Sequence, residues 1–197
     1  ARGENRSPIH MNCSGKHAAM LATCVINGWE IENYLSPVHP LQVGMKAKLE
    51  ELSGERIAFE GVDGCGAPVH ALSLPALARL AQSVVTAQDG TPERIVADAM
   101  RAYPEYVGGT RRDVTHFMSS VPGLLAKDGA FGVYTGSFAD GRAMALKVEG
   151  GSEQGRNAAM AGLLIYLGVP ESAVHTYSAQ PVLGGGKVVG SIHPTLS

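Results

Sequence analysis

Apolar residues recur along most of this chain at the spacing of amphipathic helices, and shorter alternating segments interrupt them. The helical spacing predicts helices at residues 17–27, 41–52, 74–87, 91–102, 113–120 and 153–167. Alternation of apolar and polar residues predicts strands at residues 57–62, 130–138 and 143–148, and a closing hairpin within residues 180–194. No internal repeat or low-complexity tract divides this pattern.

Turn and capping residues support these boundaries. Gly28 follows the first predicted helix, where glycine readily adopts the left-handed backbone of a helix end, and Pro75 stands in a first helical turn. Asp140 and Gly141 form a tight-turn signal between two predicted strands. Helices, then strands, then a helix and a closing strand pair indicate an α+β fold with an antiparallel sheet. We predict one unit over residues 1–197, because no linker-like segment divides the chain.

Composition excludes several classes of partner. The 197 residues carry 16 basic and 18 acidic side chains, for a formal net charge of -2, and the basic residues form no run. We therefore expect neither nucleic acid nor an anionic membrane as a partner. The longest apolar helical stretch, residues 158–169, is too short to span a bilayer. Three cysteines, an odd number without a secretory leader pattern, indicate free thiols in a reducing compartment, so we expect a cytoplasmic protein.

A first candidate site is NCSGKH, at residues 12–17, where a loop enters the first predicted helix. Unpaired N–H groups and the helix dipole at such a place can lower the pKa of Cys13, and Lys16 can face the same way. The alternative is structural: Ser14 caps the helix, and Cys13 fills a small buried space. A phosphate loop is excluded, because its first glycine is missing and His17 follows the lysine.

A second candidate is VDGCGAP, at residues 62–68, in which two glycines flank Cys65 and allow a tight bend. The plain interpretation is a turn with a buried thiol. Together with Cys13 and Lys16, however, Cys65 could form a small site for a soft metal, because zinc prefers thiolate ligands and an open site keeps a water. A lysine ligand must be a neutral amine, so burial and the metal would have to lower its pKa.

Other residues carry weaker signals. Cys24 lies on the apolar face of a predicted helix and is expected in the core. His10, His17 and His70 do not cluster, so each is expected to hydrogen-bond at a helix end or in a loop.

Lys147 stands in the apolar segment MALKV, where an unpartnered charge is unfavourable. One interpretation is a charge that protects an edge strand from pairing with other chains. The other is functional: a positioned cation, or a base with a lowered pKa. The neighbouring residues of the alternating pattern, Ala145 and Glu149, do not decide between these.

Several segments together resemble the asparaginase II family, the rhizobial or thermolabile type also called class 3 L-asparaginases. They are HMNCSGKHAAMLATC, VDGCGAPVHALSLPALARL, MRAYPEYVGGT and GAFGVYTGSFADGRAMALKVEGG, and the resemblance covers essentially the whole chain. It implies a serine-β-lactamase/glutaminase-like fold, in which a helical cluster packs on an antiparallel sheet. It also implies hydrolysis of a small amide substrate, L-asparagine, to L-aspartate and ammonia.

The resemblance also implies roles for particular residues. Lys147, in ALKVEGG, matches a lysine that pairs with the family's second active serine, which makes it a predicted catalytic residue. Cys13, Lys16 and Cys65 match a zinc site of two cysteines and one lysine that rhizobial-type members carry.

Two further residues are predicted to bind substrate. Asp63 lies two residues before Cys65, where its carboxylate could fix the Lys16 amine or hold the ammonium group of the substrate. Asn12, beside the first cysteine, is the second of these residues.

The nucleophile motif of the family, S-x-x-K, is absent from the sequence. The residues three before the lysines are Cys13, Val43, Met45, Leu124, Met144 and Gly184. The chain also opens ARGENRSPIH without a methionine, so we expect the N-terminal part of the family's domain to be missing, cleaved or on another chain. Activity would then need that segment.

These observations lead to predictions about partners and leave two rival functions. We expect a homodimer, or association with the missing N-terminal segment. One rival is a non-catalytic zinc- or amide-binding module that acts with a partner chain. The other is a penicillin-recognising hydrolase of the same fold group, which the absence of a K-T-G motif disfavours.

Overall fold

The computed structural model describes residue 5 and residues 7–195, which form two compact units. The first unit comprises the described residues up to Glu51 together with Glu55–Leu72, and the second comprises Leu52–Gly54 and the described residues from Ser73 onward. The described residues contain eight α-helices and small antiparallel sheets, which confirms the α+β class. None of the helices in this part of the chain has the length and apolar character needed to cross a bilayer.

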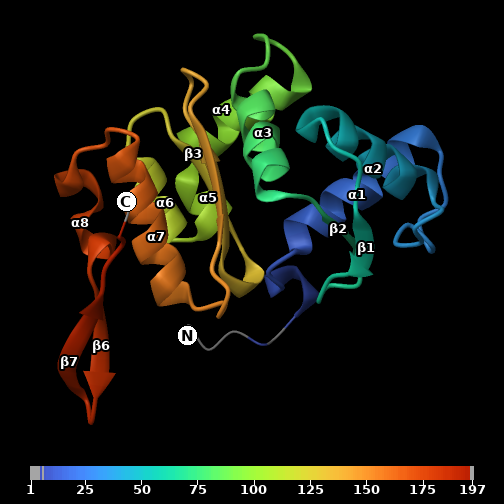
Figure 1. Ribbon diagram of the computed structural model, residues 1–197. Coiled ribbons are helices and arrows are strands. Elements are labelled where there is room, and N and C mark those ends of the chain that lie inside the picture. The colour runs from blue at the N-terminus through green and yellow to red at the C-terminus, as the bar shows by residue number, and fades with distance from the viewer. Residues whose placement is uncertain (1–4, 6, 196–197) are drawn as a thin grey trace. The chain divides into compact units, whose positions relative to one another are not determined.

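The first unit contains two helices and a hairpin (Figure 1). A short 3-10 helix, Pro8–His10, precedes its regular elements, which are α1 (Ser14–Asn27), α2 (Pro40–Ser53), β1 (Phe59–Val62) and β2 (Pro68–Ala71). Gly28 ends α1 with a φ of 68°, as predicted. A small core forms around the buried side chains of Met20, Cys24, Leu41 and Ala67, which confirms the structural role of Cys24.

Four helices in the described part of the second unit begin within one residue of the sequence prediction, and two others were not predicted. In chain order, the helices are α3 (Leu74–Val85), α4 (Pro92–Ala102), α5 (Pro104–Gly108), α6 (Asp113–Ser120), α7 (Glu153–Tyr166) and α8 (Glu171–Ser178). The hydroxyl of Ser73 accepts a hydrogen bond from the N–H of Ala76 at the start of α3, and Thr91 does the same for Arg94 at the start of α4. Each of these helices has a proline in its first turn, where the missing N–H is not needed.

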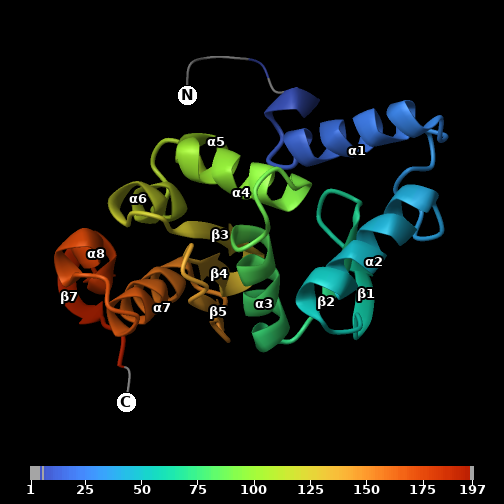
Figure 2. The ribbon, with the colours of Figure 1, turned by 90° about the horizontal axis from the view of Figure 1, so that it is seen from above.

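A three-stranded antiparallel sheet, in the order β3-β4-β5, lies at the centre of the second unit. Its strands are β3 (Leu125–Gly129), β4 (Val133–Ser137) and β5 (Ala143–Lys147). In Figures 1 and 2 the sheet stands between α3 on one side and α6 and α7 on the other. Tyr134 of β4 pairs in register with Leu146 of β5, and both are buried in the main core together with Phe117, Met160 and Leu164.

The strand predicted at residues 130–138 is shorter in the structure. Its first residues form a 3-10 turn, Ala130–Gly132, in which Phe131 has a φ of 54° and a ψ of 38°. Phe131 is the one non-glycine residue with positive φ in the described part of the chain. A left-handed residue cannot continue a strand, so β4 begins only at Val133.

The predicted C-terminal hairpin is confirmed as β6 (Gln180–Gly184) and β7 (Lys187–Ile192). Gly185 and Gly186 connect the two strands with φ values of 56° and 78°. Figure 1 shows the hairpin extending away from α7 and α8. Most of its side chains are exposed, so it contributes little to the core of the second unit.

A network of buried charges connects α6, α7 and the sheet. Nη2 of Arg156 donates to both carboxylate oxygens of Asp113 at 3.0 Å, and its Nη1 lies 3.4 Å from Oδ2 of Asp128. The side chains of Arg156 and Asp113 are only 5% and 1% exposed. A buried charge is unfavourable unless it is paired, so these residues depend on one another.

We predict that Arg156→Met destabilises the second unit by about 3–5 kcal/mol, because Asp113 would keep a buried charge with only the more distant Arg112, at 3.7 Å, as its partner. Urea unfolding followed by far-UV circular dichroism measures the effect. The control is Arg94→Met, which breaks a surface pair with Asp98 and should lower stability far less. Similar losses for the two variants would contradict the prediction.

A second prediction concerns acid. Burial raises the pKa of Asp128, but the hydrogen bond from Lys127 and the positive charges of Lys127, Arg112 and Arg156 outweigh it, so the pKa lies below its ordinary value. The ionised carboxylate therefore stabilises the fold above the unfolded-state pKa of about 3.9, and this contribution is lost as the pH falls through the lower folded-state value. The unfolding free energy of wild type should exceed that of Asp128→Asn by the largest amount above about pH 5. This difference should shrink as the pH falls toward about 3. A gap that stays constant over this range would show that the charge of Asp128 has no such role.

Candidate metal centre

The start of α1 and the turn between β1 and β2 bring the two sequence motifs together in the first unit. Cys13 is the residue before the first turn of α1, so its side chain lies at the helix end. The hairpin reverses over residues 63–67, where the N–H of Asp63 donates to the carbonyl of Ala67 at 2.8 Å. Gly66 has a φ of 85°, which explains why a glycine follows Cys65 in this tight turn.

Four of the predicted site residues meet there. One sulfur from Cys13, one from Cys65 and a carboxylate oxygen of Asp63 all lie within 4.8 Å of one another. Oδ2 of Asp63 lies 3.7 Å from the sulfur of Cys65 and 3.4 Å from Nζ of Lys16. The side chains of Lys16 and Asp63 are 41% and 43% exposed, so solvent screens part of their attraction.

Asp63 is held as a carboxylate. The N–H of Gly64 donates to its Oδ1 at 2.7 Å, and this bond is the main reason that the pKa of Asp63 lies below its ordinary value. Partial burial raises the pKa, and the hydrogen bond and positive charge of Lys16, with a hydrogen bond from Cys65, lower it again. A stable negative charge therefore stands between the two thiols and the lysine.

The pKa values of the two thiols shift in opposite directions, and the lowered pKa of Cys13 that the sequence left as one of two interpretations is not found. Burial, and then a hydrogen bond with Cys65, raise the pKa of Cys13, despite its position at the start of α1. The pKa of Cys65 is instead lowered to about 7, first by the N–H of Ala67 and then by His17. The backbone of the hairpin turn, and not the helix end, thus favours a thiolate here. Ser14 does not cap α1 through its side chain, because Cys13 occupies the cap position.

Lys16 also differs from expectation. Burial favours its neutral amine, but a hydrogen bond and charge interaction with Cys65, together with Cys13 and Asp63, raise its pKa above the ordinary value. Burial alone therefore does not prepare this amine as a metal ligand. In the protein as described, Lys16 is an ammonium ion paired with Asp63.

The donor set fits a soft divalent cation. Two sulfurs and a carboxylate oxygen are ligands that zinc accepts, and two ligand atoms on one zinc ion lie roughly 3–4 Å apart. The 4.8 Å spread of these atoms is within small side-chain rotations of that arrangement. Asp63 thus stands beside Lys16 as a possible third ligand, a role that the sequence interpretation did not give it.

Asn12 lies in the exposed turn that leads into α1, and its role in binding substrate stays a prediction. His17, expected only as a hydrogen-bonding residue, does bond to another side chain: its Nδ1 lies 2.6 Å from the hydroxyl oxygen of Tyr34. Its position four residues after Cys13, one helical turn along, is the sequence signal that links it to this cluster.

Lys147 belongs to the second unit and ends β5, at an edge of the central sheet. Its side chain is exposed, and its ammonium group donates to the carbonyl oxygens of Phe131 and Val148. Phe131, whose carbonyl oxygen accepts a hydrogen bond from Lys147, is also the residue with the left-handed backbone. Gly132 comes next, and a Cβ there would lie 2.9 Å from Cβ of Val148, so only glycine fits beside this contact.

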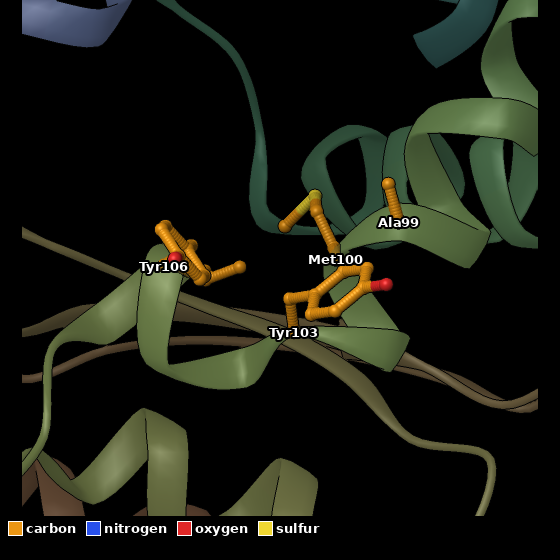
Figure 3. A pocket seen from close by; sticks show the side chains of 5 residues that line it. Ala99, Met100, Tyr103 and Tyr106 are labelled. Carbon is orange, nitrogen blue, oxygen red and sulfur yellow. The ribbon is translucent and has the colours of Figure 1, made fainter.

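The second unit also contains a cavity of about 530 Å³, lined by Ala99, Met100, Tyr103, Tyr106 and Val107. Figure 3 shows Met100 and the two tyrosines around it, and the tyrosine rings meet edge to face at 6.3 Å. These lining side chains carry no charge. Among the described residues, this lining therefore offers no charged group to hold the carboxylate and ammonium of a free amino acid.

Comparison with known proteins identifies the class to which these features belong. The family model described as L-asparaginase II matches residues 1–194 of the chain. A search of curated proteins gave no match. The chain therefore belongs to the L-asparaginase II family, a family of L-asparaginase enzymes, and the predicted resemblance is confirmed.

Proposed function

We propose that this chain is part of an L-asparagine amidohydrolase that forms L-aspartate and ammonia. The family match over residues 1–194 is the observation that carries this proposal. The cluster of Cys13, Lys16, Asp63 and Cys65 supports it, because the two motifs that carried the resemblance meet in one place. For the fold we propose the serine-β-lactamase/glutaminase-like arrangement, supported by a central antiparallel sheet between helices.

The proposed chemistry is acyl transfer. A serine activated by a lysine attacks the side-chain amide carbon, ammonia leaves, and water then cleaves the acyl-enzyme. The 197 residues contain no S-x-x-K motif, so in this mechanism the serine comes from a segment outside them, on the same or another chain. Lys147 has its amine fixed between two carbonyl oxygens, and it would tune the second serine or stabilise developing negative charge.

The proposed metal is zinc, held by Cys13 and Cys65 with Lys16 or Asp63. Bound there, zinc would supply a positive charge and an open coordination position for water or substrate. Asp63 and Asn12 would hold the polar groups of the substrate, and Asp63 has the negative charge that an ammonium group requires. Because Asp63 pairs with Lys16, either a metal or a substrate ammonium would compete for the same carboxylate oxygen.

The other expectations stay proposals. We propose a cytoplasmic protein, supported by three free cysteines, and a small-molecule amide as substrate. We also propose either a homodimer or association with a separate nucleophile-bearing segment. The second candidate function is a non-catalytic zinc- or amide-binding module, which the absence of S-x-x-K and the presence of the thiol cluster favour.

The first test of this function is ammonia release from L-asparagine. The 197-residue chain should release none alone, and activity should appear when a segment bearing the S-x-x-K serine is supplied. In that complete enzyme, Lys147→Met should lower turnover roughly tenfold or more, about 1.4 kcal/mol in the barrier. Lys187→Met, which removes another exposed strand lysine, is the matched control and should leave turnover unchanged.

Two results would contradict the proposal. Robust turnover by the 197 residues alone would require a nucleophile within them. Normal turnover in Lys147→Met would assign Lys147 to protection of the edge strand β5 instead.

The second test is metal content. The purified chain should bind one zinc ion, and Cys13→Ala and Cys65→Ala should each abolish binding, because the thiolates are the preferred ligands. Lys16→Met and Asp63→Asn separate the remaining possibilities, since only loss of the true third ligand should weaken binding strongly. Cys24→Ala is the matched control, because that thiol is buried in the core. Equal zinc content in all three cysteine variants would rule out this centre.

A further inference from the structure

The two thiols of the candidate site lie close enough to react with each other. The sulfurs of Cys13 and Cys65 are within 4.8 Å of one another. Sulfurs in a disulfide are about 2.0 Å apart, so this pair lies within about 3 Å of bonding distance. Rotation about the Cα–Cβ bonds of the two cysteines moves their sulfurs on this scale. A disulfide is therefore within reach of side-chain rotation and small backbone shifts.

The backbone around both sulfurs leaves room for such shifts. Cys13 precedes the first turn of α1 and so lies outside the regular helix. Cys65 lies in the turn between β1 and β2, between two glycines. A Cβ added at Gly15 or Gly64 would meet no atom within 4 Å among the described residues, so both turns have open space beside them.

Solvent reaches this pair of thiols but not the third one. Cys13 and Cys65 are half-buried, whereas Cys24 is 0% exposed in the core of the first unit. Lys16 and Asp63, which complete the cluster, are also partly exposed. A partly exposed thiol with a second thiol beside it is the usual setting of reversible cysteine oxidation. A small oxidant can therefore distinguish two of the three cysteines.

We propose that Cys13 and Cys65 form a reversible oxidation site, in which hydrogen peroxide joins them as an intramolecular disulfide. One thiol takes an oxygen atom from the peroxide, which gives a sulfenic acid and one water. The second thiol then displaces the hydroxyl group, so that the S–S bond forms and a second water leaves. The pair loses two hydrogens in total, and the peroxide is reduced to water. A dithiol reductant returns both thiols by exchange.

The disulfide has two consequences. It closes a loop over residues 13–65, which restricts the unfolded chain and should make the first unit more resistant to unfolding. It also competes with the metal centre of the proposed function, on which this second consequence rests. A metal ligand must be a thiolate, so a disulfide at these sulfurs would release zinc, and bound zinc would slow the oxidation.

The experiment treats the metal-free 197-residue chain with hydrogen peroxide and maps its tryptic fragments by mass spectrometry. Trypsin cleaves after lysine and arginine, which places the three cysteines in separate fragments, residues 7–16, 17–46 and 57–79. Fragments 7–16 and 57–79 should appear as one linked species, lighter by two hydrogen atoms than their sum. A dithiol reductant should separate them again. Fragment 17–46 should stay unlinked, with Cys24 as a free thiol.

Single-cysteine variants provide the controls. Cys13→Ser and Cys65→Ser should each abolish the linked species, and Cys24→Ala should retain it. Urea unfolding followed by the fluorescence of Trp29, which packs against the core of the first unit, measures the stability. Oxidation should raise the urea midpoint of wild type and of Cys24→Ala, but not that of the other two variants.

Three outcomes would overturn this inference: oxidation of Cys13 and Cys65 to separate sulfinic acids, a link that involves Cys24, or a link between two chains on a non-reducing gel. The linked fragments should form whether or not the chain binds zinc. Failure of the proposed metal centre, seen as no zinc bound by the reduced chain, would therefore leave the oxidation site standing. Conversely, zinc binding without the linked fragments would overturn the oxidation site alone.

Discussion

The burial of one positive charge governs the second unit. Arg156 has lost nearly all contact with water, and its guanidinium group must find its hydrogen bonds inside the protein. Asp113 supplies two of them from the first turn of α6, and Asp128 supplies another from β3. These contacts fix α6, α7 and the sheet edge against one another more specifically than apolar packing could. The ring of Tyr134, below the guanidinium at 5.3 Å, completes the enclosure.

The first unit differs from the second, because it has a small core and an exposed polar cluster. Its cluster combines residues that the chain separates by about fifty positions, because α1 and the β1–β2 turn each contribute two. The turn matters most: the N–H groups of Gly64 and Ala67 stabilise negative charge on Asp63 and Cys65. Backbone groups thus tune the site, and its side chains supply the chemistry.

Sequence predicted those elements whose signals are local. The predicted starts of α3 and α4 and both boundaries of α6 agree with the structure to within one residue, because a first-turn proline or a helical pattern needs only neighbouring residues. Strands β2 and β3 and helices α5 and α8 were missed, since short elements carry too few residues to show a period and depend on their partners.

The candidate site shows the same difference between features that the sequence predicts and features that depend on the folded chain. Family resemblance grouped Cys13, Lys16 and Cys65, and the structure brings all three to one place. The ordering of the two thiol pKa values was not predictable, because it depends on which N–H groups the hairpin turn directs at each sulfur.

The left-handed backbone of Phe131 has a consequence for laboratory evolution. The left-handed conformation costs an L-residue roughly 1–2 kcal/mol of stability that glycine does not lose. The ring of Phe131 is 83% exposed, so its packing offsets little of this cost. Selection for thermal resistance alone would therefore favour glycine at this position. If Lys147 acts in turnover as proposed, selection for turnover would depend on this residue too, because the carbonyl of Phe131 accepts a hydrogen bond from Lys147. Selection for thermal resistance and selection for turnover could thus favour different residues at position 131. A phenylalanine retained under both would indicate that its aromatic ring has a role of its own.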